Sequence, residues 1–174
     1  MRKSAIAAAL AFILLIPVGA SGHLKTAVPD SRAALGPTDH FGAQLVLTPD
    51  EQGFAEALVS RSRLPQLPWE YILTRGSSVT AVLVFQGCAT NGAGRCDVVA
   101  EFSVISPSGT EMSGGAGELW SDPPVPGGLH IGNSSVGLSF GQDDAVGQYH
   151  IIANVTDQVS GRRLMLDSPL TLRE

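Results

Sequence analysis

The plainest structural signal in this chain is the stretch from Asp144 to Leu172, DAVGQYHIIANVTDQVSGRRLMLDSPLTL. Apolar and polar residues alternate with a period of two on both sides of the run Asp157–Gly161, which has turn-forming composition. Such alternation is typical of a strand with one buried face. We therefore expect two strands joined by a turn. Pro169 lacks an N–H for the ladder, which places the second strand at a sheet edge or next to a bulge.

The same period recurs upstream. It predicts strands over the apolar residues of 41–47, 79–85 and 98–104. Farther along, Leu129 and Ile131 have one parity, whereas Val136 and Leu138 have the other. A continuous strand would turn the second pair to the opposite face, so we expect a bulge or break within 132–135.

One short helix interrupts this pattern. The run Thr48-Pro49-Asp50-Glu51 predicts a helix start with Thr48 as the cap and Pro49 at the first helical position. Phe54 and Leu58 follow four residues apart, which is the spacing of a helix lying on a sheet. Past residue 68, we expect an extended connection before the next strand.

Together these patterns predict an all-β protein. The expected fold is an antiparallel, immunoglobulin-like β-sandwich of about seven strands with one short N-terminal helix, spanning residues 39–174. Most connections contain Gly or Pro, which suits tight turns.

The pattern of the first residues is typical of an export signal. Arg2 and Lys3 precede an apolar run closed by small residues, so residues 1–20 predict a signal peptide, followed by an extended lead-in over 21–38. The run is too short to span a bilayer, which takes roughly 20 residues. We expect a mature chain without a membrane anchor, located in the periplasm or secreted.

Cys88 and Cys96 flank a loop rich in Gly and Asn. In an exported protein, two such cysteines most simply form a disulfide. A metal site would need two further ligands, and the neighbouring sequence supplies neither a histidine nor a third cysteine.

The motif Asp144-x-x-Gly147-x-Tyr149 resembles the entry to the penultimate strand of immunoglobulin-like and macroglobulin-like domains. In those domains the tyrosine hydroxyl bonds to nearby backbone and fixes a corner. The resemblance implies a structural role for these three residues. It does not extend to the immunoglobulin Cys…Trp…Cys spacing, which this chain lacks.

A broader likeness covers most of the expected mature chain. The chain resembles a family of secreted bacterial β-sandwich proteins to which no function is attached. The resemblance implies the fold and the compartment, and it implies no catalytic residue. The stretches that carry it are 41–48, 85–88 with 94–96, 101–104 before 107–110, and 144–161.

Charge and motifs limit the functions that the chain can have. The net charge of −5 and the lack of a basic run argue against nucleic acid as a partner. No two histidines have a metal-ligand spacing, and Asp143 with Asp144 lacks the alternating pattern of a calcium loop. Cleavage before His23 would create an N-terminal histidine, as copper-dependent polysaccharide oxygenases have. We disfavour the hypothesis that this chain is such an enzyme. We expect neither a metal nor a cofactor.

Trp69, Tyr71 and Trp120 remain as a possible binding surface, although aromatic residues at strand edges more often cover a core. The sequence favours a noncatalytic binding or accessory module that acts through loops or a strand edge. Its partner would be another periplasmic or extracellular protein, or a glycan. The alternative is an enzyme whose site is assembled from residues distant in sequence.

Overall fold

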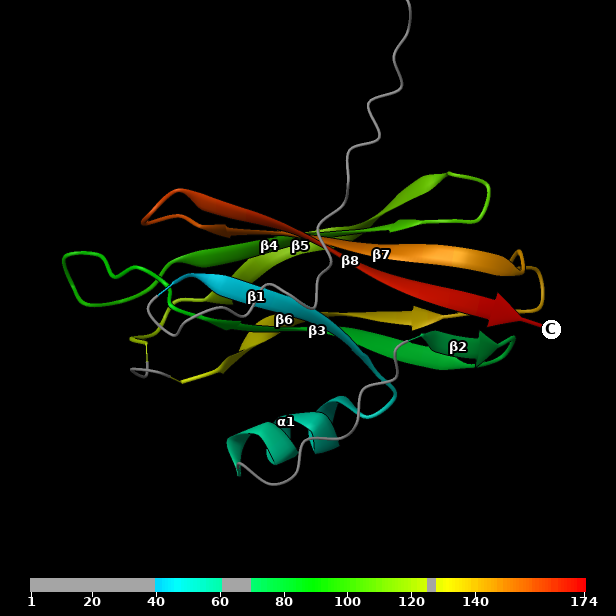
Figure 1. Ribbon diagram of the computed structural model, residues 1–174, viewed down its shortest axis with the longest axis horizontal. Helices are drawn as coiled ribbons and strands as arrows, with labels where there is room; N and C mark the ends of the chain where they lie inside the picture. Colours follow the sequence, from blue (N-terminus) through cyan, green and yellow to red (C-terminus); the bar gives the residue numbers. More distant parts are fainter. Residues whose placement is uncertain (1–39, 61–69, 125–127) are drawn as a thin grey trace, which may run out of the picture.

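The computed structural model describes residues 40–60, 70–124 and 128–174. The expected signal peptide, the lead-in, His23 and Trp69 all lie outside these ranges. Within them the chain forms two sheets and one helix (Figure 1). The elements are β1 Gly42–Thr48, α1 Glu51–Val59, β2 Tyr71–Thr74, β3 Ser78–Gln86, β4 Val98–Ile105, β5 Glu111–Trp120, β6 His130–Ser139, β7 Gly147–Asp157 and β8 Arg162–Arg173. No helix among the described residues is long and apolar enough to cross a membrane.

Sheet A has the strand order β1-β3-β6, and sheet B has the order β2-β8-β7-β4-β5. All neighbours pair antiparallel except β2, which runs parallel to β8. The expectation of a wholly antiparallel fold of about seven strands is therefore corrected in two ways. The described residues form eight strands, and sheet B is mixed because β2 runs parallel to β8.

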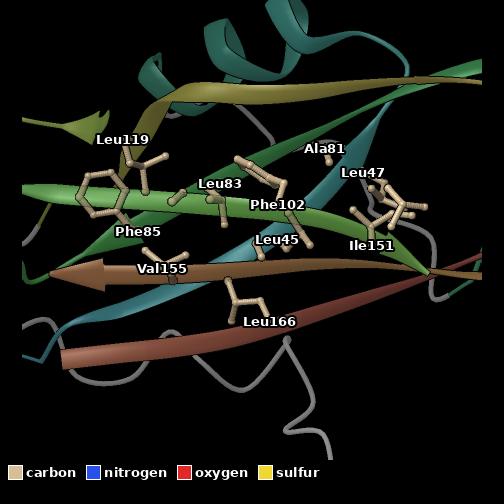
Figure 2. Close-up of a cluster of buried hydrophobic side chains, with 14 of the residues drawn as sticks. Leu45, Leu47, Ala81, Leu83, Phe85, Phe102, Leu119, Ile151, Val155 and Leu166 are labelled. Carbon is tan, nitrogen blue, oxygen red and sulfur yellow. The ribbon is translucent and has the colours of Figure 1, made fainter. Parts of the chain in front are cut away.

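The core lies between the two sheets. Figure 2 shows side chains from β1, β3, β4, β5, β7 and β8 converging in this layer. Each buried leucine or phenylalanine contributes roughly 1.5–3 kcal/mol relative to exposure, so this layer is the main source of stability. Its largest fully buried aliphatic and aromatic members are Phe85, Leu83, Leu119, Ile151, Leu166, Leu170 and Leu172.

Helix α1 lies on the side of sheet A that faces away from sheet B (Figure 1). Phe54 is buried there against Val46, Val82 and Val84, as the spacing of Phe54 and Leu58 predicts. The expected cap is wrong. The cap is Asp50, whose carboxylate accepts a hydrogen bond of 2.9 Å from the Gly53 N–H.

Thr48 instead ends strand β1, and its hydroxyl donates to the carbonyl oxygen of Asp50 at 3.0 Å. Pro49 precedes the helix. The pairing of β1 with β3 continues as far as Thr48, opposite Thr80, and this pairing delays the helix by two residues. A tertiary contact has therefore overridden a local capping signal.

The parity change in β6 is confirmed as an irregularity in pairing. Val82 pairs with Ser135, whereas Val84 pairs with Ile131, so β6 contains extra residues at this point. The shift turns Val136 toward the main core and leaves Ile131 against the cluster beneath α1.

Strand β8 is an edge strand over part of its length. Pro169 pairs with His150 of β7, and the pairing with β2 begins at the next residue, Leu170. No other described strand pairs with the same side of β8 between Arg162 and Pro169. The proline thus lies within an edge segment, as predicted, although β8 as a whole is not the outermost strand.

The corner at the start of β7 has the predicted form. Tyr149 is 4% exposed, and its hydroxyl donates to the Ala145 carbonyl at 2.8 Å. The Asp144 carboxylate accepts from the Gly141 N–H at 2.6 Å. Gly147 has φ +135, and a Cβ there would lie 3.0 Å from Pro107. Burial raises the pKa of Tyr149, helped by the Asp144 carboxylate and opposed by Arg75, so the hydroxyl stays protonated and donates.

The disulfide between Cys88 and Cys96 is present, as predicted. The loop that it closes is also held by hydrogen bonds. The Asn91 side chain accepts from the Ala93 and Arg95 N–H groups, at 2.9 and 3.2 Å. In addition, the Cys96 N–H donates to the Asp122 carbonyl, and the Arg95 Nε donates to the Ser121 carbonyl.

We expect reduction of this disulfide to lower the free energy of unfolding by about 2–3 kcal/mol while the protein stays folded, because the loop is short. The hydrogen bonds around Asn91 and the core between the sheets remain. Urea unfolding with and without reductant measures the loss. Unfolding on reduction alone would contradict the expectation, as would free thiols in protein purified without reductant.

Candidate functional site

Of the aromatic residues expected as a binding surface, Trp69 lies outside the described residues, and Tyr71 and Trp120 are not brought together. Tyr71 pairs with Leu170, which pairs with Tyr149 near the start of β7. Trp120 pairs with Val98, which pairs with Asp157 at the end of β7. Those two points of β7 are about 26 Å apart at the rise of a strand. Tyr71 and Trp120 are each partly buried against the main core.

Trp120 belongs to an aromatic cluster with Phe85 and His130. The His130 ring lies 5.2 Å from the Phe85 ring and 4.8 Å from the Trp120 ring, between centroids. The indole N–H donates to the Asp122 carbonyl at 3.0 Å. The side chain of Trp120 is thus engaged at the margin of the core. Burial lowers the pKa of His130 from its ordinary value of 6.5.

The pKa of His130 has a consequence for stability. Well above pH 6.5 His130 is neutral in both the folded and the unfolded chain. As the pH falls below 6.5, the unfolded chain takes up the proton more readily, so acidification lowers the free energy of unfolding. We expect His130→Phe to reduce this loss between pH 7 and pH 5. Urea unfolding of both proteins at several pH values tests it, and equal pH slopes would contradict it.

A pair of titratable residues, His150 and Asp167, lies on the outer face of sheet B. His150 Nδ1 lies 2.9 and 3.1 Å from the two carboxylate oxygens of Asp167. No local sequence pattern indicates this pair, because the two residues are 17 apart in the chain. The register set by the turn at Asp157–Gly161 could have revealed it, since His150 pairs with Pro169 and Asp167 is then its diagonal neighbour. Within the described ranges, no three His, Cys, Asp or Glu side chains lie together as a possible metal site.

Strand β5 is one of the two edge strands of sheet B, opposite β2, and its middle consists of small residues, Gly114–Gly117. Its pairing with β4 shifts opposite Phe102–Ser103 and again opposite Val98–Val99. No strand is expected here from the sequence, because glycines have low strand propensity. At its far end β5 approaches β6 so closely that a Cβ on Gly132 would collide with Leu119.

Two shallow hollows adjoin the small residues of β5. The first, about 450 Å³, lies on the outer face of sheet B. The second, about 300 Å³, lies between the facing edges of β5 and β6. The first is lined by Val99, Ala100, Glu101, Ala116, Gly117, Asn154 and Thr156. The second is lined by Phe102, Gly114, Gly115, Ala116, Gly117, Asn133, Ser134, Ser135 and Val136.

The hairpin register indicates which backbone groups of β5 are free to bind. The Ser106 N–H donates to the Thr110 carbonyl, which closes the β4–β5 turn. Hydrogen-bonded and non-hydrogen-bonded pairs alternate in an antiparallel ladder, so the N–H and C=O groups of Glu111 and Ser113 point away from β4. Residues 111–113 are exposed. Farther on, the Ser134 hydroxyl donates to the Glu118 carbonyl at 2.7 Å, so the free edge ends before Glu118.

No family model and no curated protein sequence matches the chain. Among solved structures, a family 123 glycoside hydrolase from Clostridium perfringens is 12% identical and covers 77% of this chain and 27% of its own, with a TM-score of 0.49. An alkylpurine DNA glycosylase from Pseudomonas fluorescens is 12% identical, with 59% and 27% covered and a TM-score of 0.39. An immunoglobulin-like protein from Pseudomonas aeruginosa is 14% identical, with 79% and 100% covered and a TM-score of 0.33. The chain thus spans about a quarter of the length of the first two proteins. These values are so low that they assign neither a family nor an activity.

Proposed function

We propose that this protein is an exported, noncatalytic binding module with an immunoglobulin-like sandwich fold, which binds an extended segment of another exported protein along β5. The observation that carries the proposal is the free edge at residues 111–116, with a hollow on either side of Gly114–Gly117. A strand edge supplies backbone hydrogen bonds to an added strand, and adjoining hollows accept its alternate side chains.

Export is part of the same proposal. Residues 1–20 act as a signal peptide and are removed, and the disulfide between Cys88 and Cys96 suits an oxidising compartment. The resemblance to secreted bacterial β-sandwich proteins supports the same compartment. Mass spectrometry of the exported product tests this part, and retention of the apolar segment would contradict it.

The binding mode is tested by nuclear magnetic resonance with the peptide acetyl-TTVTVTT-amide, which favours an extended conformation. We expect shifts of the amide signals to concentrate at residues 111–117, together with slower hydrogen exchange at Glu111 and Ser113. The matched control peptide carries N-methyl groups on alternate amides, which removes the donors along one edge. The same measurement with a chito-oligosaccharide hexamer tests whether the partner is instead a glycan.

Ser113→Pro provides a matched variant of the protein. It removes an N–H that points away from β4, so the fold should tolerate it while peptide binding falls. The proposal fails if the peptide shifts signals elsewhere or nowhere. It also fails if the N-methylated peptide binds equally well, or if only the oligosaccharide binds.

The alternative function, an enzyme, is favoured by one observation. The carboxylate of Asp167 holds the His150 ring on Nδ1, and the His150 side chain is 37% exposed. A carboxylate that orients an imidazole is the arrangement of a general base. Hydrolysis of a chromogenic ester, phosphate or glycoside that is lost in His150→Gln, with the fold intact, would support this alternative.

A further inference from the structure

The outer face around the free edge of β5 carries three carboxylates that have no basic partner among the described residues. Glu101 is opposite Ala116, Glu111 is opposite Ile105, and Glu118 is opposite Val99, so all three side chains share one face of the sheet. All three residues are exposed. None of them takes part in an ion pair with another described residue; Glu118 accepts a hydrogen bond from the Ser121 hydroxyl.

We propose that the free edge of β5 selects an extended peptide segment with two basic residues four positions apart. This inference rests on the proposed function and adds the chemistry of the partner. On β4, Ile105 and Glu101 are four residues apart and lie opposite Glu111 and Ala116. A strand added to β5 would therefore place its residues i and i+4 beside Glu111 and beside Ala116, on the same face.

The small side chain of Ala116 brings Glu101 within reach of such a partner. An added strand would lie about 9–10 Å from β4, two strand spacings away. A lysine side chain is long and flexible, and the hollow over Ala116 and Gly117 leaves its path toward Glu101 open. The second basic residue would lie directly beside Glu111, where cross-strand pairs of opposite charge are favourable.

A second copy of this chain is a poor occupant of the same edge. Antiparallel pairing of two β5 strands with Glu111 opposite Ala116 would direct Glu111 of one copy toward Glu101 of the other. Like charges placed in this way destabilise the pairing. The net charge of −5 adds a general repulsion between copies.

The experiment uses the full chain and three peptides of one length, acetyl-TKVTVKT-amide, acetyl-TTVTVTT-amide and acetyl-TEVTVET-amide. We expect the lysine peptide to bind about five- to tenfold more tightly than the threonine peptide at low salt, as two partly exposed ion pairs would give. The advantage should shrink at 0.3 M salt because of screening. The glutamate peptide should bind most weakly.

Glu101→Gln and Glu111→Gln should each reduce binding of the lysine peptide about threefold and leave the threonine peptide unchanged. Glu56→Gln, on α1 beside sheet A, is the matched control and should change neither. If the threonine peptide binds at β5 and the lysine peptide binds no more tightly, the charge selectivity is wrong and the binding mode stands. If neither peptide binds at β5, both proposals fail.

Discussion

Tyr149→Ala should lower the free energy of unfolding by about 3–5 kcal/mol, the range found when a large buried aromatic side chain is removed. The ring is buried between the sheets and packs edge-on against Phe140, with centroids 5.1 Å apart. Its hydroxyl also holds the Ala145 carbonyl at the corner before β7. Denaturant unfolding measures the loss.

Two further variants separate the contributions at this corner. Tyr149→Phe keeps the ring and removes only the hydrogen bond to Ala145, so we expect a loss of about 0.5–1.5 kcal/mol. Tyr71→Ala removes a tyrosine that is only partly buried, at the margin of the same core, and should cost less than Tyr149→Ala. If Tyr149→Ala costs no more than Tyr71→Ala, Tyr149 is not the anchor of the corner. Peptide binding at β5 should survive in all three variants that fold.

Strands whose alternate residues are large and apolar could be predicted from the sequence, because the alternation within each strand indicates which of its faces is buried. The runs at 79–85 and 98–104 and the pair around the turn at Asp157–Gly161 are of this kind. The corner at Tyr149 was also predictable. Its three residues lie within one short motif, and the hydroxyl reaches a carbonyl only four residues away.

The missed strands depend on partners that are remote in sequence. The four residues of β2 pair only with residues 170–173 of β8, and nothing local specifies that pairing. In β5 the small residues serve the approach of neighbouring strands: a Cβ on Gly114 would lie 3.1 Å from the Phe102 Cβ, and one on Gly117 would lie 3.0 Å from the Ser134 hydroxyl. The lack of large side chains therefore hid the strand whose edge we propose as the binding site.

Asp157 is a further buried group without a sequence motif around it. Its side chain is fully buried (0% exposed), and its carboxylate accepts hydrogen bonds from two segments of the chain. One oxygen accepts from the Ala89 N–H at 2.9 Å and from the Ser160 hydroxyl at 2.6 Å. The other oxygen accepts from the Val159 N–H at 3.1 Å. Asp157 therefore joins the disulfide loop to the β7–β8 turn.

Asp157→Ala should lower the free energy of unfolding by about 3 kcal/mol, because buried donors such as the Ala89 N–H lose a charged acceptor. Asp157→Asn keeps one accepting oxygen and should cost about 2 kcal/mol. The matched control is Asp122→Asn, in the adjoining loop. The Asp122 carboxylate is exposed and paired with Arg95, so its loss should cost less than about 1 kcal/mol. Equal losses for Asp157→Asn and Asp122→Asn would contradict this role.

Asp157→Ala should also change how much the disulfide contributes to stability. A disulfide stabilises a protein to the extent that the folded state orders a loop that the unfolded chain leaves free. In Asp157→Ala the Ala89 N–H is released, so the loop between Cys88 and Cys96 is less ordered before unfolding. Reduction should then cost Asp157→Ala less than it costs the wild type, whereas Asp122→Asn should lose the full amount. Four unfolding curves, wild type and Asp157→Ala with and without reductant, give the coupling between the two sites. Strictly additive losses would mean that the carboxylate and the disulfide stabilise this end of the molecule independently.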